Sequence, residues 1–451
     1  MTEPYYQDKL TKLYNSDCRS MSELPDETVQ CVVTSPPYWG LRKYEGDQEL
    51  IWGGDALCEH EWGDNLHRAG YRASDTNPGK LQSMATQNRN VGHSNFCQKC
   101  GAWKGSFGLE PTPELYVQHT VEIMQEIKRV LRKDGVCFLN LGDSYFASGG
   151  AHKPEHANPG LSKSAQRGGV PHGGQNHPNL KPKDMCLIPF RVAIALQDAG
   201  WWVRSVIIWQ KKNPMPESVQ DRPTNAHEYI LMLTKSKKYY YDVDAVREKL
   251  SPTTMPRLLR GVSNTHKNIN GAPGQTPHTM SQHREHGEGY ANINPAGRNL
   301  RDVWTFPTQP FPGAHFAVFP EKLPELCIKA ATSEKGCCPK CGAPWARVID
   351  RDNYQKHESE YQSKEVRGIN ADRSKHSPPV DTKTIGWKPT CNCGLDPIPC
   401  TVLDPFAGSG TSLLVAKKLQ RKAVGYELSR DYCKLDEARI RSYMPLWNEV
   451  K

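Results

Sequence analysis

The sequence has no apolar segment long enough to span a membrane, and its N-terminus has no apolar signal core. Only 37% of its 451 residues are hydrophobic, and the mean hydropathy is −0.69. Internal repeats are also absent. These absences argue against a membrane protein and a repeat protein, and they indicate a soluble, intracellular chain with much polar loop. At this length we expect one main domain with insertions, or a few smaller units.

The charge balance is only moderately one-sided, because 58 lysines and arginines face 49 aspartates and glutamates, for a net charge of +9. This excess permits a polyanionic partner such as nucleic acid but does not identify one. The 15 cysteines are many for a protein of a reducing compartment. Disulfides are rare there, so closely spaced cysteines predict metal sites.

The hexapeptide Thr-Ser-Pro-Pro-Tyr-Trp at residues 34–39 follows the apolar run at 29–33. The run predicts a buried strand that the consecutive prolines must end, because proline has no N–H for a sheet ladder. The prolines would hold the carbonyls of Ser35 and Pro36 and the ring of Tyr38 at the carboxyl edge of a sheet. Such acceptors beside an aromatic ring suit a flat heterocycle with an amino group. From the hexapeptide alone, a plain strand-ending loop is the alternative.

A second motif, Asp-Pro-Phe-Ala-Gly-Ser-Gly-Thr at 404–411, lies between a predicted strand at 401–404 and a predicted helix at 411–419. Its glycines allow a tight turn and a close approach to a ligand, and the helix start offers free N–H groups. Glu427 closes the next predicted strand, 423–427, where an acid commonly binds ribose hydroxyls. A tight turn with a surface glutamate is the alternative. A phosphate-binding loop fits poorly, because no Gly-Lys-Ser/Thr follows.

Strand and helix patterns alternate along the chain. We predict strands from 13 to near 17 and at 29–34, 136–141, 201–209, 227–234, 401–404 and 423–427, and helices at 113–131, 188–199, 320–331, 411–419 and 431–443. This alternation implies a mostly parallel sheet covered on both faces by helices.

The two motifs together resemble those of the β class of S-adenosylmethionine-dependent DNA amino-methyltransferases, in which the catalytic motif precedes the cofactor motif. Further stretches at 14–18, 139–145, 212–216, 221–229 and 316–323 are similar to that family. The resemblance implies an α/β fold of a specific kind. It is a circularly permuted, Rossmann-like methyltransferase domain with a mostly parallel seven-stranded sheet, here carrying two small zinc-binding insertions.

The resemblance also implies catalytic roles. The catalytic residues would be Ser35, Pro36, Pro37 and Tyr38. Ser35 and the Pro36 carbonyl would accept hydrogen bonds from the target amine, and Tyr38 would stack on a base swung out of the duplex. Catalysis is then mainly alignment for in-line methyl transfer, without a strong general base.

The implied cofactor site lies in the second half of the chain, with one contribution from the first. Its residues would be Asp404, Phe406, Gly408, Gly410, Thr411, Glu427, Asp17 and Phe319. Glu427 would hold the ribose, Asp17 would lie near the adenine edge, and the stretch 316–323 would close over the methionine end.

The predicted organisation interleaves the catalytic core with insertions. Residues 1–39 would be the catalytic half of the core, 40–112 a zinc-binding insertion, 113–249 the continued core, 250–312 a target-recognition or flexible region, 313–336 a cofactor-site helix, 337–398 a second zinc-binding insertion and 399–451 the cofactor-binding half.

Two pairs of cysteines have the spacing of zinc knuckles, in which a tight turn points both sulfurs at one ion. The predicted ligands are Cys58, His60, Cys97 and Cys100 in the first site, and Cys338, Cys341, Cys391 and Cys393 in the second. Both would be structural, because methyl transfer from a sulfonium needs no metal. Reduced free cysteines are the alternative, and Cys337 is an alternative ligand. One or both insertions would grip DNA, or would serve as a lid or brace without DNA contact.

The predicted function is site-specific methylation of an exocyclic amine in double-stranded DNA, with S-adenosylmethionine as cofactor. In the family, serine at position 35 favours cytosine N4, whereas aspartate there is the more common sign of adenine N6. The alternatives are adenine N6, RNA or a glutamine amide as the target, and a non-catalytic zinc-bearing DNA-binding protein. The intact Asp404 and Glu427 argue against the last. The resemblance implies a cytoplasmic enzyme of a bacterium or a phage-infected cell, with a cognate restriction endonuclease as candidate partner.

Overall fold

A computed structural model describes residues 3–40, 48–62, 95–146, 177–249, 297–309, 318–349 and 384–443. The chain divides into two compact units. The first contains residues 1–239, 303–328 and 401–451, and the second contains 240–302 and 329–400. The predicted target-recognition region, 250–312, lies mostly outside the described residues. None of the helices in the described ranges is both long and apolar enough to cross a bilayer.

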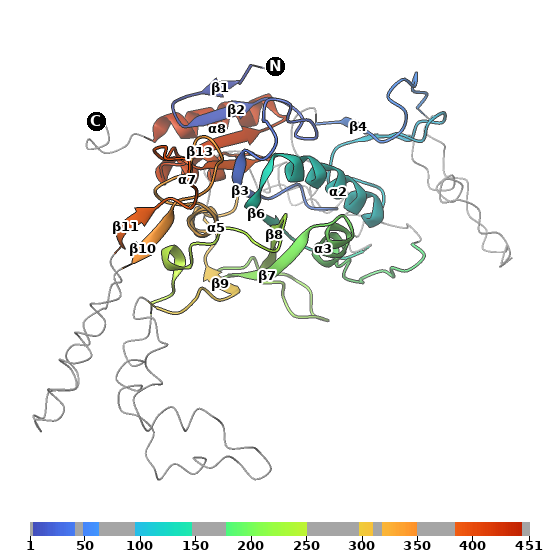
Figure 1. Ribbon diagram of the computed structural model, residues 1–451. Coiled ribbons are helices and arrows are strands. Elements are labelled where there is room, and N and C mark those ends of the chain that lie inside the picture. Colours follow the sequence, from blue (N-terminus) through green and yellow to red (C-terminus); the bar gives the residue numbers. More distant parts are fainter. Residues whose placement is uncertain are drawn as a thin grey trace, which may run out of the picture. The chain divides into compact units, whose positions relative to one another are not determined.

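The first unit is built on one large sheet (Figure 1). Its strands, in spatial order, are β1 (Tyr6–Gln7), β2 (Thr11–Tyr14), β13 (Lys422–Tyr426), β12 (Thr401–Asp404), β3 (Val29–Thr34), β6 (Leu131–Leu141), β8 (His227–Thr234), β7 (Trp202–Lys211) and β9 (Val303–Phe306). The prediction of seven strands is therefore wrong, because the described residues alone contribute nine strands to this sheet. The two additions are the short edge strands β1 and β9. They lengthen the sheet beyond the seven strands that the sequence pattern indicates.

Most neighbouring strands in this sheet are parallel, while β1, β7 and β8 contribute the antiparallel pairs. All six residues of β3 are buried, as expected for a central strand covered on both faces. In Figure 1 the red C-terminal strand β13 lies beside the blue β2, with which it pairs in parallel. Strands from the N-terminal and C-terminal parts of the chain thus lie side by side in one sheet.

Strands β12 and β3 pair in parallel at the centre of the sheet, with Val402 opposite Cys31. From β12 the chain proceeds through α7 (Thr411–Lys418) to β13 on one side. From β3 it proceeds through α2 (Pro113–Val130) to β6 on the other. This is a topological switch point, and in open α/β sheets ligands bind outside the carboxyl ends of the strands at such a point.

Local signals explain where the helices begin. Helix α2 starts after Thr112, whose side chain accepts a hydrogen bond from the Leu115 amide, with Pro113 in the first turn. Its apolar face is buried, and it packs against α3 (Ile188–Asp198). The remaining helices are α5 (Lys322–Ala331) and α8 (Arg430–Ser442), and the latter begins after the side-chain cap of Ser429.

The described part of the first insertion forms a small antiparallel hairpin of β4 (Leu50–Trp52) and β5 (Trp103–Gly105). Trp52 pairs with Trp103, and both indoles are buried. In the second unit, β10 (Ala346–Ile349) and β11 (Thr384–Lys388) form another antiparallel hairpin, and Val243–Val246 form the short helix η4. Neither hairpin belongs to the large sheet.

Candidate active site and metal centres

The two sequence motifs meet at the carboxyl edge of the sheet. Thr34, the last residue of β3, donates a hydrogen bond from Oγ1 to Oδ1 of Asp404, the last residue of β12, at 2.7 Å. Both residues are buried. Strand pairing and this bond therefore bring Ser35 and the loop after Asp404 together, although the motifs lie far apart in the sequence.

The loop that carries Ser35 and Tyr38 is tied to its surroundings on several sides. The Pro37 carbonyl accepts a hydrogen bond from Tyr116 Oη at 3.0 Å, and the buried indole of Trp39 donates to the Glu110 carbonyl at 2.9 Å. Pro36 is buried, whereas Ser35, Pro37 and Tyr38 keep partial exposure. The rigid, partly accessible strand end that the sequence predicts is present.

The glycine loop after β12 has the backbone that its sequence requires. Gly408 and Gly410 have φ values of 57° and 70°, a left-handed conformation that glycine adopts without steric cost. The Gly408 amide donates to Glu427 Oε2 at 3.0 Å, and the Ser429 amide donates to Oε1 at 2.8 Å. Glu427 therefore fixes the shape of the loop with the same carboxylate that was predicted to bind ribose.

Three acidic side chains cluster below this loop. Burial raises the pKa of Asp404 to about 7 and that of Glu427 to about 7, and it raises the pKa of Asp436 on α8 well above its usual range. The negative charges of Asp404 and Glu427 add to the effect on Asp436. A cationic ligand near the loop would favour the ionised forms of these groups.

The predicted cofactor residues divide into two sets by accessibility. Phe406, Gly408 and Glu427 are partly exposed, so a ligand can reach them. Asp404, Gly410 and Thr411 are buried and support the loop from below. Arg439 on α8 adds to this support, because it donates to the Ser409 carbonyl and to Thr411 Oγ1 at 3.0 and 2.8 Å.

The two remaining predicted cofactor residues, Asp17 and Phe319, are partly exposed. Asp17 follows β2 and forms an ion pair with Arg19 at 2.7 Å. Phe319 precedes Glu321, whose carboxylate pairs with Lys418 at 2.6 Å and with Arg439 at 3.6 Å. The segment with Phe319 is thus anchored to α7 and α8 beside the glycine loop, while residues 316 and 317 lie outside the described part.

Sequence reasoning assigned no role to three polar residues that contact Tyr38 directly or through one partner. Asn140 on β6 donates to Tyr38 Oη at 2.8 Å, and Tyr38 Oη donates to Glu228 Oε2 on β8 at 2.7 Å. Lys211 on β7 donates to the other oxygen, Glu228 Oε1, at 2.6 Å. The only sequence signal was that Asn140 and Glu228 lie in stretches that are similar to the methyltransferase family, and Lys211 lies just before another such stretch.

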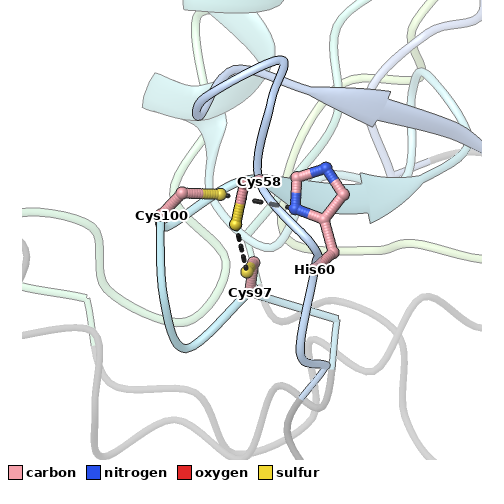
Figure 2. Close-up of side chains that lie close together, drawn as sticks. All are labelled: Cys58, His60, Cys97 and Cys100. Carbon is pink, nitrogen blue, oxygen red and sulfur yellow. Dashed lines mark hydrogen bonds between the residues drawn. The ribbon is translucent and has the colours of Figure 1, made fainter.

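The four predicted ligands of the first metal site converge in the described structure (Figure 2). Cys58 Sγ lies 3.9 Å from Cys97 Sγ, and Cys100 Sγ lies 3.4 Å from His60 Nδ1. All four ligand atoms lie within 4.8 Å of one another. Zn–S bonds of about 2.3 Å give a tetrahedral S···S edge of about 3.8 Å, so the set fits a closed zinc site.

The second predicted set, Cys338, Cys341, Cys391 and Cys393, also gathers within 4.8 Å, inside the second unit. The sulfurs of Cys341 and Cys393 are 3.7 Å apart. The Cys338 amide donates to the Ala343 carbonyl and the Gly342 amide donates to the Cys338 carbonyl, which is the tight turn of a knuckle. The group of four ligand atoms does not include Cys337, the alternative ligand, whose backbone pairs with Ile398.

The known proteins that this chain resembles in sequence are DNA methyltransferases. The N6/N4 methyltransferase family model, described as DNA methylase, matches residues 29–338 and 400–438. The type II methyltransferase M.SmaI of Serratia marcescens is 28% identical over 431 residues, which cover 95% of this chain and 90% of the relative. The type II methyltransferase M.Cfr9I of Citrobacter freundii is 34% identical over 322 residues, 71% of this chain and 72% of the relative.

A solved structure, the cytosine-N4-specific PvuII DNA methyltransferase, aligns over 100% of this chain and 91% of its own with 14% identity and a TM-score of 0.47. The family match covers most of the chain and includes both motifs, at 34–39 and 404–411. The chain therefore belongs to the DNA methylase family of S-adenosylmethionine-dependent DNA amino-methyltransferases.

Proposed function

We propose that this protein is a type II, site-specific methyltransferase that modifies N4 of a cytosine swung out of double-stranded DNA. The observation that carries the proposal is the bond between Thr34 and Asp404, which joins the catalytic loop to the cofactor loop at one sheet edge. Ser35, one residue beyond this bond, presents a neutral hydroxyl where adenine-modifying relatives more commonly have aspartate. The proposal keeps adenine N6 as the alternative target.

Partly exposed groups could bind the two substrates. S-adenosylmethionine supplies an electrophilic methyl group on a sulfonium. Phe406, Gly408 and Glu427 would hold it, because these are the accessible members of the cofactor set, and Asp17 and Phe319 would contribute at its ends. The fit is supported by the acidic side chains of Asp404 and Glu427, since a nearby cationic ligand would favour their ionised forms.

On the DNA side, Ser35 Oγ and the Pro36 carbonyl would accept hydrogen bonds from the amine of the target base. Two such bonds favour a tetrahedral nitrogen whose lone pair points toward the methyl group. Tyr38 would stack on the extruded base, and the tied-down loop would limit its movement. No covalent intermediate is needed.

The identity of the methylated base tests this proposal. We expect DNA incubated with the protein and S-adenosylmethionine, then digested to nucleosides, to yield N4-methyldeoxycytidine by mass spectrometry. N6-methyldeoxyadenosine would establish the alternative target instead. Cofactor binding without methylation of any DNA would support the non-catalytic alternative. Because relatives are named type II methyltransferases, we also propose that methylation protects DNA from a cognate restriction endonuclease.

We further propose that both cysteine clusters bind structural zinc. The support is their geometry, because each brings four ligand atoms to tetrahedral spacing and leaves no open position. Metal analysis of the purified protein should find about two zinc ions per chain, and Cys341→Ser should lower this to about one. The buried Cys327→Ser, outside both clusters, is the matched control and should keep both ions. Zinc-free parent protein with normal stability would contradict the proposal.

A further inference from the structure

The hydroxyl of Tyr38 is the centre of a connected polar group. Ser35 Oγ lies 3.1 Å from Tyr38 Oη, and Glu228 Oε2 lies 2.7 Å from it. Asn140 Nδ2 is 2.8 Å from both Tyr38 Oη and Glu228 Oε2. Lys211 Nζ completes the group at 2.6 Å from Glu228 Oε1. The hydroxyl at the far end of Tyr38, the proposed stacking residue, is therefore hydrogen-bonded to the Glu228 carboxylate.

The direction of each hydrogen bond in this group follows from its chemistry. A carboxylate paired with a lysine only accepts, so Tyr38 must donate its single hydrogen to Glu228. Asn140 donates to the same tyrosine oxygen. This fits a hydroxyl whose hydrogen is already bonded to Glu228, because its oxygen can then only accept. Ser35 must then donate its own hydrogen to Tyr38, and only its lone pairs remain for a substrate.

The group is also held in place. A Cβ added at Gly142 would lie 2.7 Å from two ring atoms of Tyr38, so the ring rests against this backbone and cannot move toward it. The Glu228 and Lys211 side chains are 15% and 24% exposed. Partial burial strengthens their attraction relative to a surface pair, while it leaves the carboxylate able to exchange protons with water.

We propose that Glu228 is a positioning residue that makes Ser35 an obligatory acceptor and then receives the proton released by methyl transfer. The inference rests on the proposed roles of Ser35 and Tyr38. As the amine nitrogen forms its bond to the methyl carbon, the carbon–sulfur bond breaks and the nitrogen becomes positively charged. One amine proton passes to Ser35 Oγ, the Ser35 proton passes to Tyr38 Oη, and the Tyr38 proton passes to Glu228 Oε2.

Each oxygen of this relay gains one proton and gives one up, and Glu228 ends as a neutral acid that returns its proton to water. Lys211 and Asn140 hold the carboxylate in the acceptor orientation before transfer. An ion pair that served stability alone would not need the tyrosine hydroxyl between it and Ser35. The relay takes its proton from the exocyclic amine, and the ring of the base takes no part. It therefore applies to cytosine and to adenine alike.

Single-turnover methylation by Tyr38→Phe, Glu228→Gln and the double variant tests the relay. Tyr38→Phe keeps the aromatic ring but removes the hydroxyl that links Ser35 to Glu228. The amide that Glu228→Gln introduces can donate a hydrogen bond to Tyr38. The Tyr38 and Ser35 hydroxyls could then turn and donate their hydrogens toward the substrate. Each single variant should methylate about a hundredfold more slowly, with DNA and cofactor affinities within about threefold of the parent. In the Tyr38→Phe background, adding Glu228→Gln should lower the single-turnover rate by less than about a further threefold.

Matched controls are Tyr239→Phe, at a partly exposed residue, and Glu49→Gln, at an exposed one; both lie outside the group and should leave the rate unchanged. The relay is overturned if either single variant keeps the parental rate, or if the two losses multiply in the double variant. The identity of the parental product tests the proposed function separately. A parent that methylates adenine would revise the base while the rate comparison still decides the relay.

Discussion

Replacing Gly410 by alanine should abolish tight binding of S-adenosylmethionine. Gly410 caps α7 with φ of +70°, and an added Cβ would lie 1.7 Å from Oδ1 of Asp436. Asp436 is fully buried, and neither of its carboxylate oxygens has a hydrogen-bond partner among the described residues. Either the enclosed carboxylate or the loop must shift, and the left-handed backbone at Gly410 strains an alanine in both cases.

The expected size of this effect follows from two costs. A left-handed conformation costs a non-glycine residue about 1–2 kcal/mol, and overpacking costs about 1–3 kcal/mol. A loss of about 3 kcal/mol in binding corresponds to an affinity lower by about a hundredfold. Calorimetric titration with S-adenosylmethionine measures this loss, and a thermal melt reports how much of the strain destabilises the free protein.

Two further variants make this test specific. Gly386→Ala is the matched control, because nothing lies within 4 Å of its added Cβ and its φ is not left-handed. It should bind the cofactor normally. Asp436→Ala in the Gly410→Ala background removes the clash but not the backbone strain, so it should restore part of the affinity. Normal cofactor binding by Gly410→Ala alone would show that the loop does not form the cofactor site.

Loss of the proposed first zinc site should strongly slow methyl transfer, because the insertion with its four candidate ligands supports the proposed catalytic loop. The knuckle at Cys97 and Cys100 leads directly into β5, and the Cys97 amide bonds to the Ala102 carbonyl at 2.7 Å. An added Cβ at Gly54, beyond β4, would lie 2.8 Å from Cys100 Sγ. The hairpin is therefore packed against the site on both of its strands.

The hairpin in turn packs against α2 and is connected to the loop at residues 35–40. The Trp52 ring lies 4.3 Å from that of His119 on α2, and His119 Nδ1 lies 3.0 Å from Glu110 Oε1. Burial lowers the pKa of His119 to about 4 and raises that of Glu110 to about 8, so this is a neutral hydrogen bond rather than an ion pair. Glu110 also accepts from Trp39 and from the Gly108 amide, at the base of the loop.

Phe107, three residues before Glu110, extends this support to the cofactor loop. Its ring stacks on Tyr116 at 5.0 Å and on Phe406 at 5.8 Å. The Gly108 carbonyl accepts from the Gly40 amide at 2.9 Å. Of the two predicted roles for the first insertion, these contacts favour the brace over the DNA grip.

The double substitution Cys97→Ser with Cys100→Ser tests the brace. Structural zinc contributes about 10 kcal/mol or more to folding of small sites, so its loss should free the hairpin. We expect single-turnover methylation at saturating DNA to fall by about a hundredfold or more, because the catalytic loop loses its alignment. Hydrogen exchange should increase in residues 35–40, while a thermal melt should still show a cooperative transition from the sheet.

The corresponding change in the other unit, Cys391→Ser with Cys393→Ser, is the matched control. It removes the same number of thiolates and one zinc ion, but the second cluster lies outside the unit that contains the catalytic loop. Its single-turnover rate at saturating DNA should stay within about threefold of the parent. If the first-site variant instead methylated normally and lost DNA affinity, the insertion would be a DNA grip.

Much of the candidate site could be read from the sequence because its signals are local. Consecutive prolines end a strand wherever they occur, and glycines before a helix allow a left-handed turn by their own chemistry. The sequence therefore predicted the strand ends at Thr34 and Asp404, the glycine loop, and which cysteines and histidine gather in the two clusters. The residue pattern also indicated the seven central strands and the helices between them, with boundaries shifted by a few residues.

The sequence by itself determined which chemistry this protein carries, through residue types that constrain the backbone at short range. Only the tertiary structure decided which distant side chains serve that chemistry. Glu228 and Asn140 reach Tyr38 because β8 and β6 are neighbours in the sheet, and Asp436 lies under Gly410 because α8 packs against α7. The edge strands β1 and β9 were missed for the same reason. Pairing and burial depend on what the fold places opposite a residue, and no short-range pattern records it.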